Sequence, residues 1–193
     1  MKKPLLALSI NVRKLQAQHL RLGNQTSVYL SGMIQRYPRM QAQYSFPVDN
    51  QDQLFRPAYA HQPSATCDRC DPAQTVSRPA RSDHGPRIHY GTIGSANIVV
   101  KDAATRDELK KDINILCVEM EAAGLMNSFP CLVIRGICDY ADSHKNKRWQ
   151  PYAAAVAAAY MKELLMVIPA QQVVQTQSAD ASSIAASGYG APH

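Results

Sequence analysis

The stretch VEMEAAGLMNSFPCLVIRGICDYAD, residues 118–142, carries two pairs of acidic residues beside apolar runs. Glu119 and Glu121 follow one such run, and Asp139 and Asp142 follow the next. Short apolar runs of this kind are typical of buried strands. If the two runs are neighbouring parallel strands, their carboxyl ends meet at one edge of a sheet, where open α/β sheets bind ligands. The pattern predicts that Glu121 and Asp139 face a shared crevice.

Two interpretations of these acids follow from the residues alone. In the first, Glu121 and Asp139 form a site whose partial burial raises a carboxyl pKa and suits it to general acid catalysis. In the second, Glu119 and Glu121 favour a helix N-terminus through its dipole, and Asp139 and Asp142 make hydrogen bonds within turns. The sequence pattern leaves both open.

A regular alternation of strands and helices surrounds this stretch. The expected strands are residues 88–93, 98–100, 113–118 and 131–138, and the expected helices are residues 102–111, 121–128 and 151–168, with Asp102 or Thr105 as a helix cap. Nearly continuous apolar strands that alternate with helices indicate a buried, mostly parallel sheet of the α/β class.

The rest of the chain divides by composition into further segments. Helical spacing from Pro4 to Leu22 and from about Thr26, where Thr26 or Ser27 is a candidate cap, to Pro38 predicts two helices. We expect N-terminal helices over 1–37, an irregular loop insertion rich in proline over 38–87, the α/β segment over 88–168 and a disordered tail over 169–193.

Charge and hydropathy narrow the function classes. The net charge of +6 is scattered apart from the short run Lys145, Lys147 and Arg148, which argues against a nucleic-acid binder. No apolar stretch approaches the roughly 20 residues that span a bilayer, so we expect no membrane partner. The chain has five cysteines, and an odd number with three in apolar runs favours a reducing compartment, so we expect a cytoplasmic protein.

The irregular segment contains the pair Cys67 and Cys70 in a CxxC spacing. Such a pair supplies half of a tetrahedral zinc site, which His61 or His84 could complete as a zinc knuckle. No second CxxC or HxxxH follows, and the other interpretation is a loop with two free thiols. We therefore expect no metal and no organic cofactor.

VEMEA followed by IRGICDYAD resembles the signature of the nucleoside phosphorylase and nucleosidase superfamily, in particular the fungal type often fused to ankyrin or NACHT regions. The likeness continues through IHYGTIGSANIVVKDAATRDEL, residues 88–109, and DSHKNKRWQPYAAAVAAAYMKELL, residues 142–165. The resemblance implies a three-layer α/β/α domain with a central mixed sheet. It also implies cleavage of the N-glycosidic bond of a purine nucleoside, with phosphate as co-substrate in phosphorylases and water in nucleosidases.

The resemblance assigns roles to individual residues. Asp139 matches the acid that donates a proton or hydrogen bond to purine N7. Glu121 matches the carboxylate that accepts hydrogen bonds from the ribose 2′- and 3′-hydroxyls, and its charge favours a nearby ribosyl cation. Met120 matches the residue that packs under the sugar, and Glu119 joins the same substrate-binding set.

Two positions depart from the family pattern. Val99 falls where nucleosidase relatives place an aromatic residue that stacks on the base. Ser95 is followed by Ala96 where the family has glycine, and alanine resists positive φ.

The nine glycines form no glycine-rich loop of the kind that binds phosphate or positions water in this family. We therefore expect the chain to be the C-terminal part of the family domain, with N-terminal strands missing and a sheet edge that invites a homo-oligomer. The alternative function is a catalytically incomplete fragment that acts as a non-enzymatic interaction module or a degenerate gene product. The sequence does not decide whether the chain is an enzyme.

Overall fold

The computed structural model describes residues 3–48, 52–126 and 131–174. Its helices and strands are, in chain order, α1 Lys3–Leu22, α2 Thr26–Arg36, α3 Gln41–Tyr44, β1 Thr92–Ser95, α4 Ala103–Ile113, β2 Ile115–Glu119, α5 Ala122–Met126, α6 Gln150–Val167 and α7 Ala170–Val174. Within these described ranges, no helix has both the length and the hydropathy that crossing a bilayer requires.

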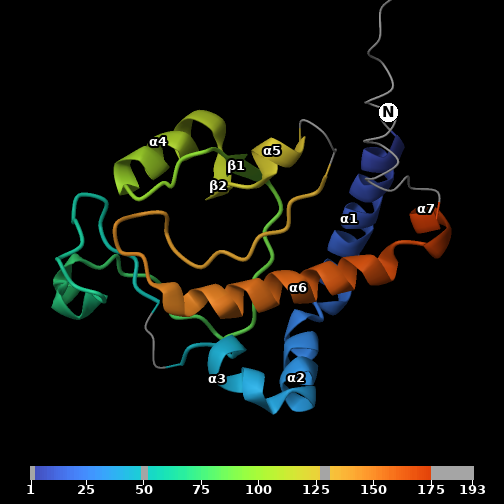
Figure 1. Cartoon of the computed structure of the whole chain (residues 1–193), viewed down its shortest axis with the longest axis horizontal. Coiled ribbons are helices and arrows are strands. Elements are labelled where there is room, and N and C mark those ends of the chain that lie inside the picture. Colours follow the sequence, from blue (N-terminus) through green and yellow to red (C-terminus); the bar gives the residue numbers. More distant parts are fainter. Residues whose placement is uncertain (1–2, 49–51, 127–130, 175–193) are drawn as a thin grey trace, which may run out of the picture.

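Helix α6 runs through the middle of the molecule and contacts α1, α2 and α3 (Figure 1). Its buried residues Tyr160 and Leu164 pack with Leu15 of α1. Farther toward its start, Ala155 and Ala159 pack against Leu30 of α2. Because alanine has a short side chain, this face of α6 allows the backbone of α2 to approach closely, and the two apolar clusters hold the N-terminal helices on α6.

The junction between α1 and α2 depends on a glycine. Gly23 has a φ of +74°, a conformation that L side chains rarely adopt, and its N–H donates to the carbonyl of His19 at 2.9 Å. The predicted end of the first helix is confirmed. The predicted cap of the second is wrong, because Thr26 is already helical and its N–H donates to Oδ1 of Asn24 at 3.2 Å.

A buried polar network joins the same region to residue 90. Nε2 of His19 lies 3.0 Å from Oε1 of Glu163, and the Tyr90 hydroxyl lies 3.2 Å from Nδ1 of His19. The same Glu163 oxygen accepts the N–H of Gln25 at 2.9 Å. Since removing one member of a buried pair costs about 3–5 kcal/mol, this network fixes α1, α6 and the segment before β1 to one another.

Strands β1 and β2 form a parallel pair connected by α4, which is a βαβ unit. Asp102 caps α4 by accepting the N–H of Thr105 at 2.7 Å, as predicted. Asn114 ends α4 with a φ of 49°, in the left-handed region that asparagine tolerates. The register places Ser95 opposite Glu119 at the carboxyl ends of the two strands. Helices with a small parallel sheet confirm the predicted α/β class, in an arrangement consistent with an incomplete phosphorylase-like sheet.

Several strands predicted from the sequence either begin at a different residue or do not form in the described part of the chain. The first begins at Thr92 instead of residue 88, and residues 98–100 form no strand because β1 has no partner on that side among the described residues. Residues 131–138 are extended chain outside the sheet. They run beside the start of α6 instead, where Gly136 meets the backbone of Ala153.

The remaining segments agree with the sequence in part. Residues 38–87 are mostly irregular, with α3, short 3-10 turns and one bridge between Phe55 and Thr75. Residues 170–174 of the predicted tail form α7, and residues 175–193 lie outside the described residues, as do residues 127–128 of the predicted helix 121–128.

We predict that Gly136→Ala destabilises the fold by about 1–3 kcal/mol or more. A Cβ at residue 136 would lie 1.9 Å from the carbonyl oxygen of Ala153, which is a backbone atom of α6 that cannot turn aside. Urea denaturation followed by far-UV circular dichroism measures the change.

The matched control is Gly32→Ala in α2, where an added Cβ meets nothing within 4 Å. This change should stabilise the helix by roughly 0.5–1 kcal/mol. Equal stability of the Gly136→Ala variant and the wild type would contradict the close packing of residues 131–138 on α6.

Candidate active site

Glu119 ends β2 as a buried carboxylate, with 4% of its surface exposed. Its Oε2 accepts the N–H groups of Glu121 and Ala122, both at 2.9 Å, and thereby organises the start of α5. Burial pushes the pKa of Glu119 upward, but hydrogen bonds from the Ser95 hydroxyl and from these two amides outweigh burial and lower it. For Glu119 the helix N-terminus interpretation is confirmed.

Glu121 lies at the exposed turn between β2 and α5. Its Oε2 is 3.6 Å from Nη1 of Arg135 and accepts the N–H of Met120 at 3.1 Å. The Met120 side chain is exposed beside it. Because 74% of its side-chain surface is exposed, the Glu121 carboxylate keeps acceptor capacity for a ligand.

Asp139 lies in the loop that follows residues 131–138 and is partly buried. Its Oδ1 accepts the N–H of Ala141 at 2.9 Å, and Nζ of Lys145 lies 3.1 Å from both carboxylate oxygens. Ala141 has a φ of 53°, so the turn is held in a conformation that alanine rarely adopts. The turn and the lysine together fix the direction of the Asp139 carboxylate.

Arg135 lies beside Glu121, and Cys138 lies beside Asp139. The Cys138 thiol donates to Oδ2 of Asp139 at 3.7 Å, and its pKa is raised by burial and by Asp139, against the opposing effects of Arg135 and Lys145. Arg135, which lies beside Glu121, and Asp139, which contacts Cys138 and Lys145, are four residues apart on one segment of the chain. We name these five residues the Glu121–Asp139 site.

Two cavities of the described part of the chain lie away from the two acids. One cavity of about 260 Å³ lies among α2, α3 and residues 84–86, and another of about 390 Å³ lies on α2. Neither is lined by Glu121 or Asp139. Glu121 is exposed and Asp139 is partly buried, and the crevice predicted between them stays a prediction.

Ser95 and Val99 occupy different surroundings. Oγ of Ser95 accepts the N–H of Ala123 at 2.9 Å, so Ser95 helps to hold α5 at the end of the sheet. Val99 lies in irregular chain and is 48% exposed. The structure therefore places Ser95 beside Glu119 and leaves Val99 on the surface.

Asp142 is a buried turn residue. Its Oδ1 accepts the N–H of His144 at 2.8 Å, and its Oδ2 lies 3.8 Å from Nη1 of Arg106. Together with the Asp139–Ala141 bond, this confirms that both aspartates make turn hydrogen bonds.

Tyr140 connects the same loop to the irregular segment, because its hydroxyl donates to Oδ1 of Asp52 at 2.6 Å. Burial and Asp52 raise the pKa of Tyr140 to about 12.

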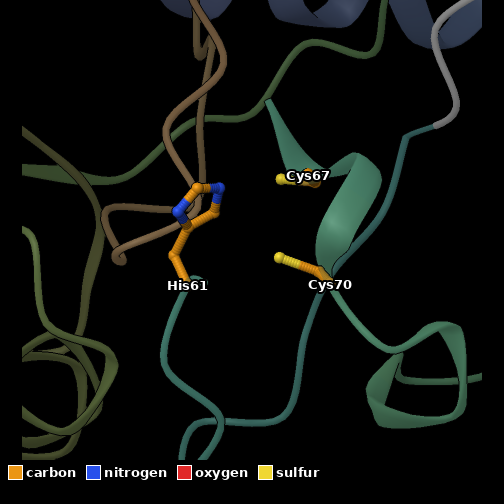
Figure 2. Close-up of side chains that lie close together, drawn as sticks. All are labelled: His61, Cys67 and Cys70. Carbon is orange, nitrogen blue, oxygen red and sulfur yellow. The ribbon is translucent and has the colours of Figure 1, made fainter. Parts of the chain in front are cut away.

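A second group of reactive side chains lies outside the Glu121–Asp139 site. Figure 2 shows the sulfur atoms of Cys67 and Cys70 pointing toward the imidazole of His61. One ligand atom from each residue lies within 4.8 Å of the other two. Burial and the neighbouring Cys70 raise the pKa of the Cys67 thiol to about 11. His84, the other candidate in the sequence, stacks on Phe46 at 4.5 Å between ring centres.

Comparison with known proteins identifies the family. The family model described as the phosphorylase superfamily matches residues 34–166, more than half of the chain. The chain belongs to the phosphorylase superfamily. The resemblance found in VEMEA and IRGICDYAD is confirmed.

Individual relatives of this phosphorylase superfamily chain match parts of it. It is 58% identical over 96 residues to a nucleotide-binding leucine-rich repeat (NLR)-like protein of Hyaloscypha variabilis, covering 50% of this chain and 10% of that protein. It is 34% identical over 89 residues to a 5′-methylthioadenosine/S-adenosylhomocysteine nucleosidase of Mycobacterium bovis, covering 44% of this chain and 35% of that protein. The chain therefore spans about a third or less of each of these relatives. No solved structure matches it.

Two residues of the Glu121–Asp139 site were missed by sequence reasoning about catalytic groups. Arg135 is the one charged residue in the apolar run CLVIRGIC, and this isolated charge was the available signal. Lys145 was visible only as part of a surface basic run. Its pairing with Asp139, six residues earlier, depends on a turn that the sequence pattern does not define.

We predict that Glu119→Gln makes the free energy of unfolding less dependent on pH in the acidic range. Because the folded-state pKa of Glu119 lies below its ordinary 4.5, its stabilising effect is complete above that value and is lost as pH falls through the folded-state pKa. Above pH 4.5 the variant should be about 1–2 kcal/mol less stable than the wild type. Below the folded-state pKa the two should converge.

Urea denaturation at a series of pH values measures this difference. The control is Glu108→Gln, at an exposed glutamate of α4. A constant gap between Glu119→Gln and the wild type at every pH would mean that the charge of Glu119 is not what holds the β2–α5 turn.

Proposed function

We propose that this chain supplies the base- and ribose-contacting groups of a site that cleaves the N-glycosidic bond of a purine nucleoside. The observation that carries the proposal is that a chain of the phosphorylase superfamily places Glu121 beside Arg135, four residues before an Asp139 held by its own turn and by Lys145. The similarity to a 5′-methylthioadenosine/S-adenosylhomocysteine nucleosidase supports a purine, because both substrates in that name carry adenine.

Glu121 is proposed to hold the ribose. Its carboxylate is exposed, and two oxygens match the two hydroxyls of a vicinal diol. Arg135, 3.6 Å away, restrains the carboxylate without enclosing it. The negative charge also favours the ribosyl cation that forms as the glycosidic bond breaks.

Asp139 is proposed to protonate the leaving base. Its carboxyl donates a proton to purine N7, the bond between C1′ and N9 breaks, and the base leaves with the electron pair. Water or phosphate then attacks C1′ of the ribosyl oxocarbenium ion. In the free chain Lys145 contacts both Asp139 oxygens, so substrate entry displaces Lys145 from at least one of them. The step uses no organic cofactor.

We predict that Asp139→Asn lowers base release by roughly 10²–10⁴-fold, because the amide has no acidic proton to give. Inosine, adenosine and methylthioadenosine are incubated with the chain, with and without phosphate, and free base is measured by chromatography. The control is Asp83→Asn, at an exposed aspartate paired with Arg87. Unchanged release in Asp139→Asn would refute the role of Asp139.

A second candidate function is a non-enzymatic interaction module, and one observation favours it. Large apolar side chains near the sheet are exposed, including Ile98, Leu116, Leu125 and Ile137. Soluble monomers rarely leave many such residues uncovered together, so a partner or a second copy would be the natural cover. Absence of base release at high protein concentration, together with concentration-dependent association in ultracentrifugation, would favour this function.

We propose a cytoplasmic location for either function, because all five cysteines are free.

A further inference from the structure

The CxxC segment presents its two sulfur atoms from one short turn. Cys67–Arg69 is a 3-10 turn in which the N–H of Cys70 donates to the carbonyl of Cys67 at 2.9 Å. This turn places both sulfur atoms on one side, facing His61 (Figure 2). The ring of His61 is itself positioned, since its Nε2 lies 3.2 Å from the carbonyl oxygen of Thr66. Three residues that commonly ligate metals are therefore gathered within 4.8 Å in an otherwise irregular segment.

His144 supplies a second, independent observation at the same place. It is buried, with 9% of its surface exposed, and its Nε2 has no hydrogen-bond partner among the described residues. Its ring stacks on Phe55 at 4.1 Å and meets the ring of His61 edge-on at 5.4 Å between centres. A buried nitrogen without a partner is costly, and a ligand beside His61 would remove that cost.

We propose that His61, Cys67 and Cys70 bind one zinc ion, with His144 as the fourth ligand. Two thiolates and imidazole nitrogens are the donor set that zinc takes in closed tetrahedral sites. Zinc bonds of about 2.0–2.3 Å bring ligand atoms to roughly 3.5–3.8 Å from one another, so the side chains of His61, Cys67 and Cys70 draw together by about 1 Å. His144 lies outside this 4.8 Å group, with its ring centre 5.4 Å from that of His61, and turns toward the ion as it binds. Each cysteine gives its proton to solvent as its sulfur binds the ion.

The ion would connect two loops that already touch. His61 donates its backbone N–H to Oγ of Ser143 at 3.0 Å, next to His144. Tyr140 and Asp52 join the same loops farther along. Zinc at this position would stabilise the loop that contains Asp139 and His144. This effect does not depend on whether Asp139 acts on a nucleoside. The role is structural, because none of the four ligands belongs to the Glu121–Asp139 site.

The test is metal content of the full chain, purified in the presence of zinc and under reducing conditions. Mass spectrometry of bound metal should give one zinc ion per chain, and cobalt(II) in its place should show thiolate charge-transfer and tetrahedral d–d absorption. Removal by a chelator should lower Tm. His61→Gln, Cys67→Ser and Cys70→Ser should abolish stoichiometric binding, and His144→Gln should weaken it roughly tenfold or more.

Matched controls use the same residue types outside the cluster. Cys131→Ser and His84→Gln should keep one zinc ion, since Cys131 lies on the extended segment beside α6 and His84 stacks on Phe46. Metal retained in Cys67→Ser, or no stoichiometric metal in the wild type, overturns the proposal. A disulfide between Cys67 and Cys70 found under reducing conditions also overturns it. If the serine variants do not fold, a wild-type cobalt spectrum without thiolate charge transfer decides against the site.

Discussion

The close contact between Gly136 and the backbone of Ala153 is the constraint on which the arrangement of this chain depends. A Cβ at residue 136 would meet the Ala153 carbonyl oxygen at 1.9 Å, so only glycine lets residues 131–138 lie against the start of α6. The same helix carries α1, α2 and α3 on its remaining surface. Arg135 and Cys138 flank this contact, and the position of the extended segment therefore decides where the charged groups of the site stand relative to the N-terminal helices.

Hydrogen bonds and ion pairs then determine how the acidic side chains of the site are oriented. The carboxylate of Glu119 accepts the amides of the β2–α5 turn, whereas that of Glu121, two residues later, is exposed. Asp139 is aimed by its own turn and by Lys145. The two glutamates differ because of their surroundings. A buried carboxylate that accepts backbone amides stabilises the fold, whereas an exposed carboxylate retains acceptors for a ligand. Under the proposed function these groups contact base and ribose, and the described residues contain no glycine-rich cradle for phosphate.

How much of this could be predicted depended on whether the information was local. The helices α1, α4 and α6 and the Asp102 cap follow from spacing and capping residues near in sequence, and the turn bonds of Asp139 and Asp142 are equally local. The position of CLVIRGIC, residues 131–138, depends on contacts that are distant in sequence. An apolar run looks the same in sequence whether it joins a sheet or lies along a helix, and the contact of Gly136 with Ala153 places this run on α6. The meeting of His61, which lies beside the CxxC pair, with His144 likewise depends on tertiary structure, since 82 residues separate His61 from Ser143, the residue before His144 that accepts the N–H of His61.

Glu121 and Asp139 are proposed to serve one nucleoside, and calorimetric binding of adenosine and 2′,3′-dideoxyadenosine tests this pairing. If Glu121 accepts the ribose diol, the wild-type chain should bind the dideoxy compound roughly 10–100-fold more weakly, because hydrogen bonds to a charged group contribute about 1.5–3 kcal/mol. In Glu121→Gln that difference should shrink strongly, while Asp83→Asn should keep it. Equal affinity of the wild-type chain for the two compounds, or no binding of either, would contradict the account.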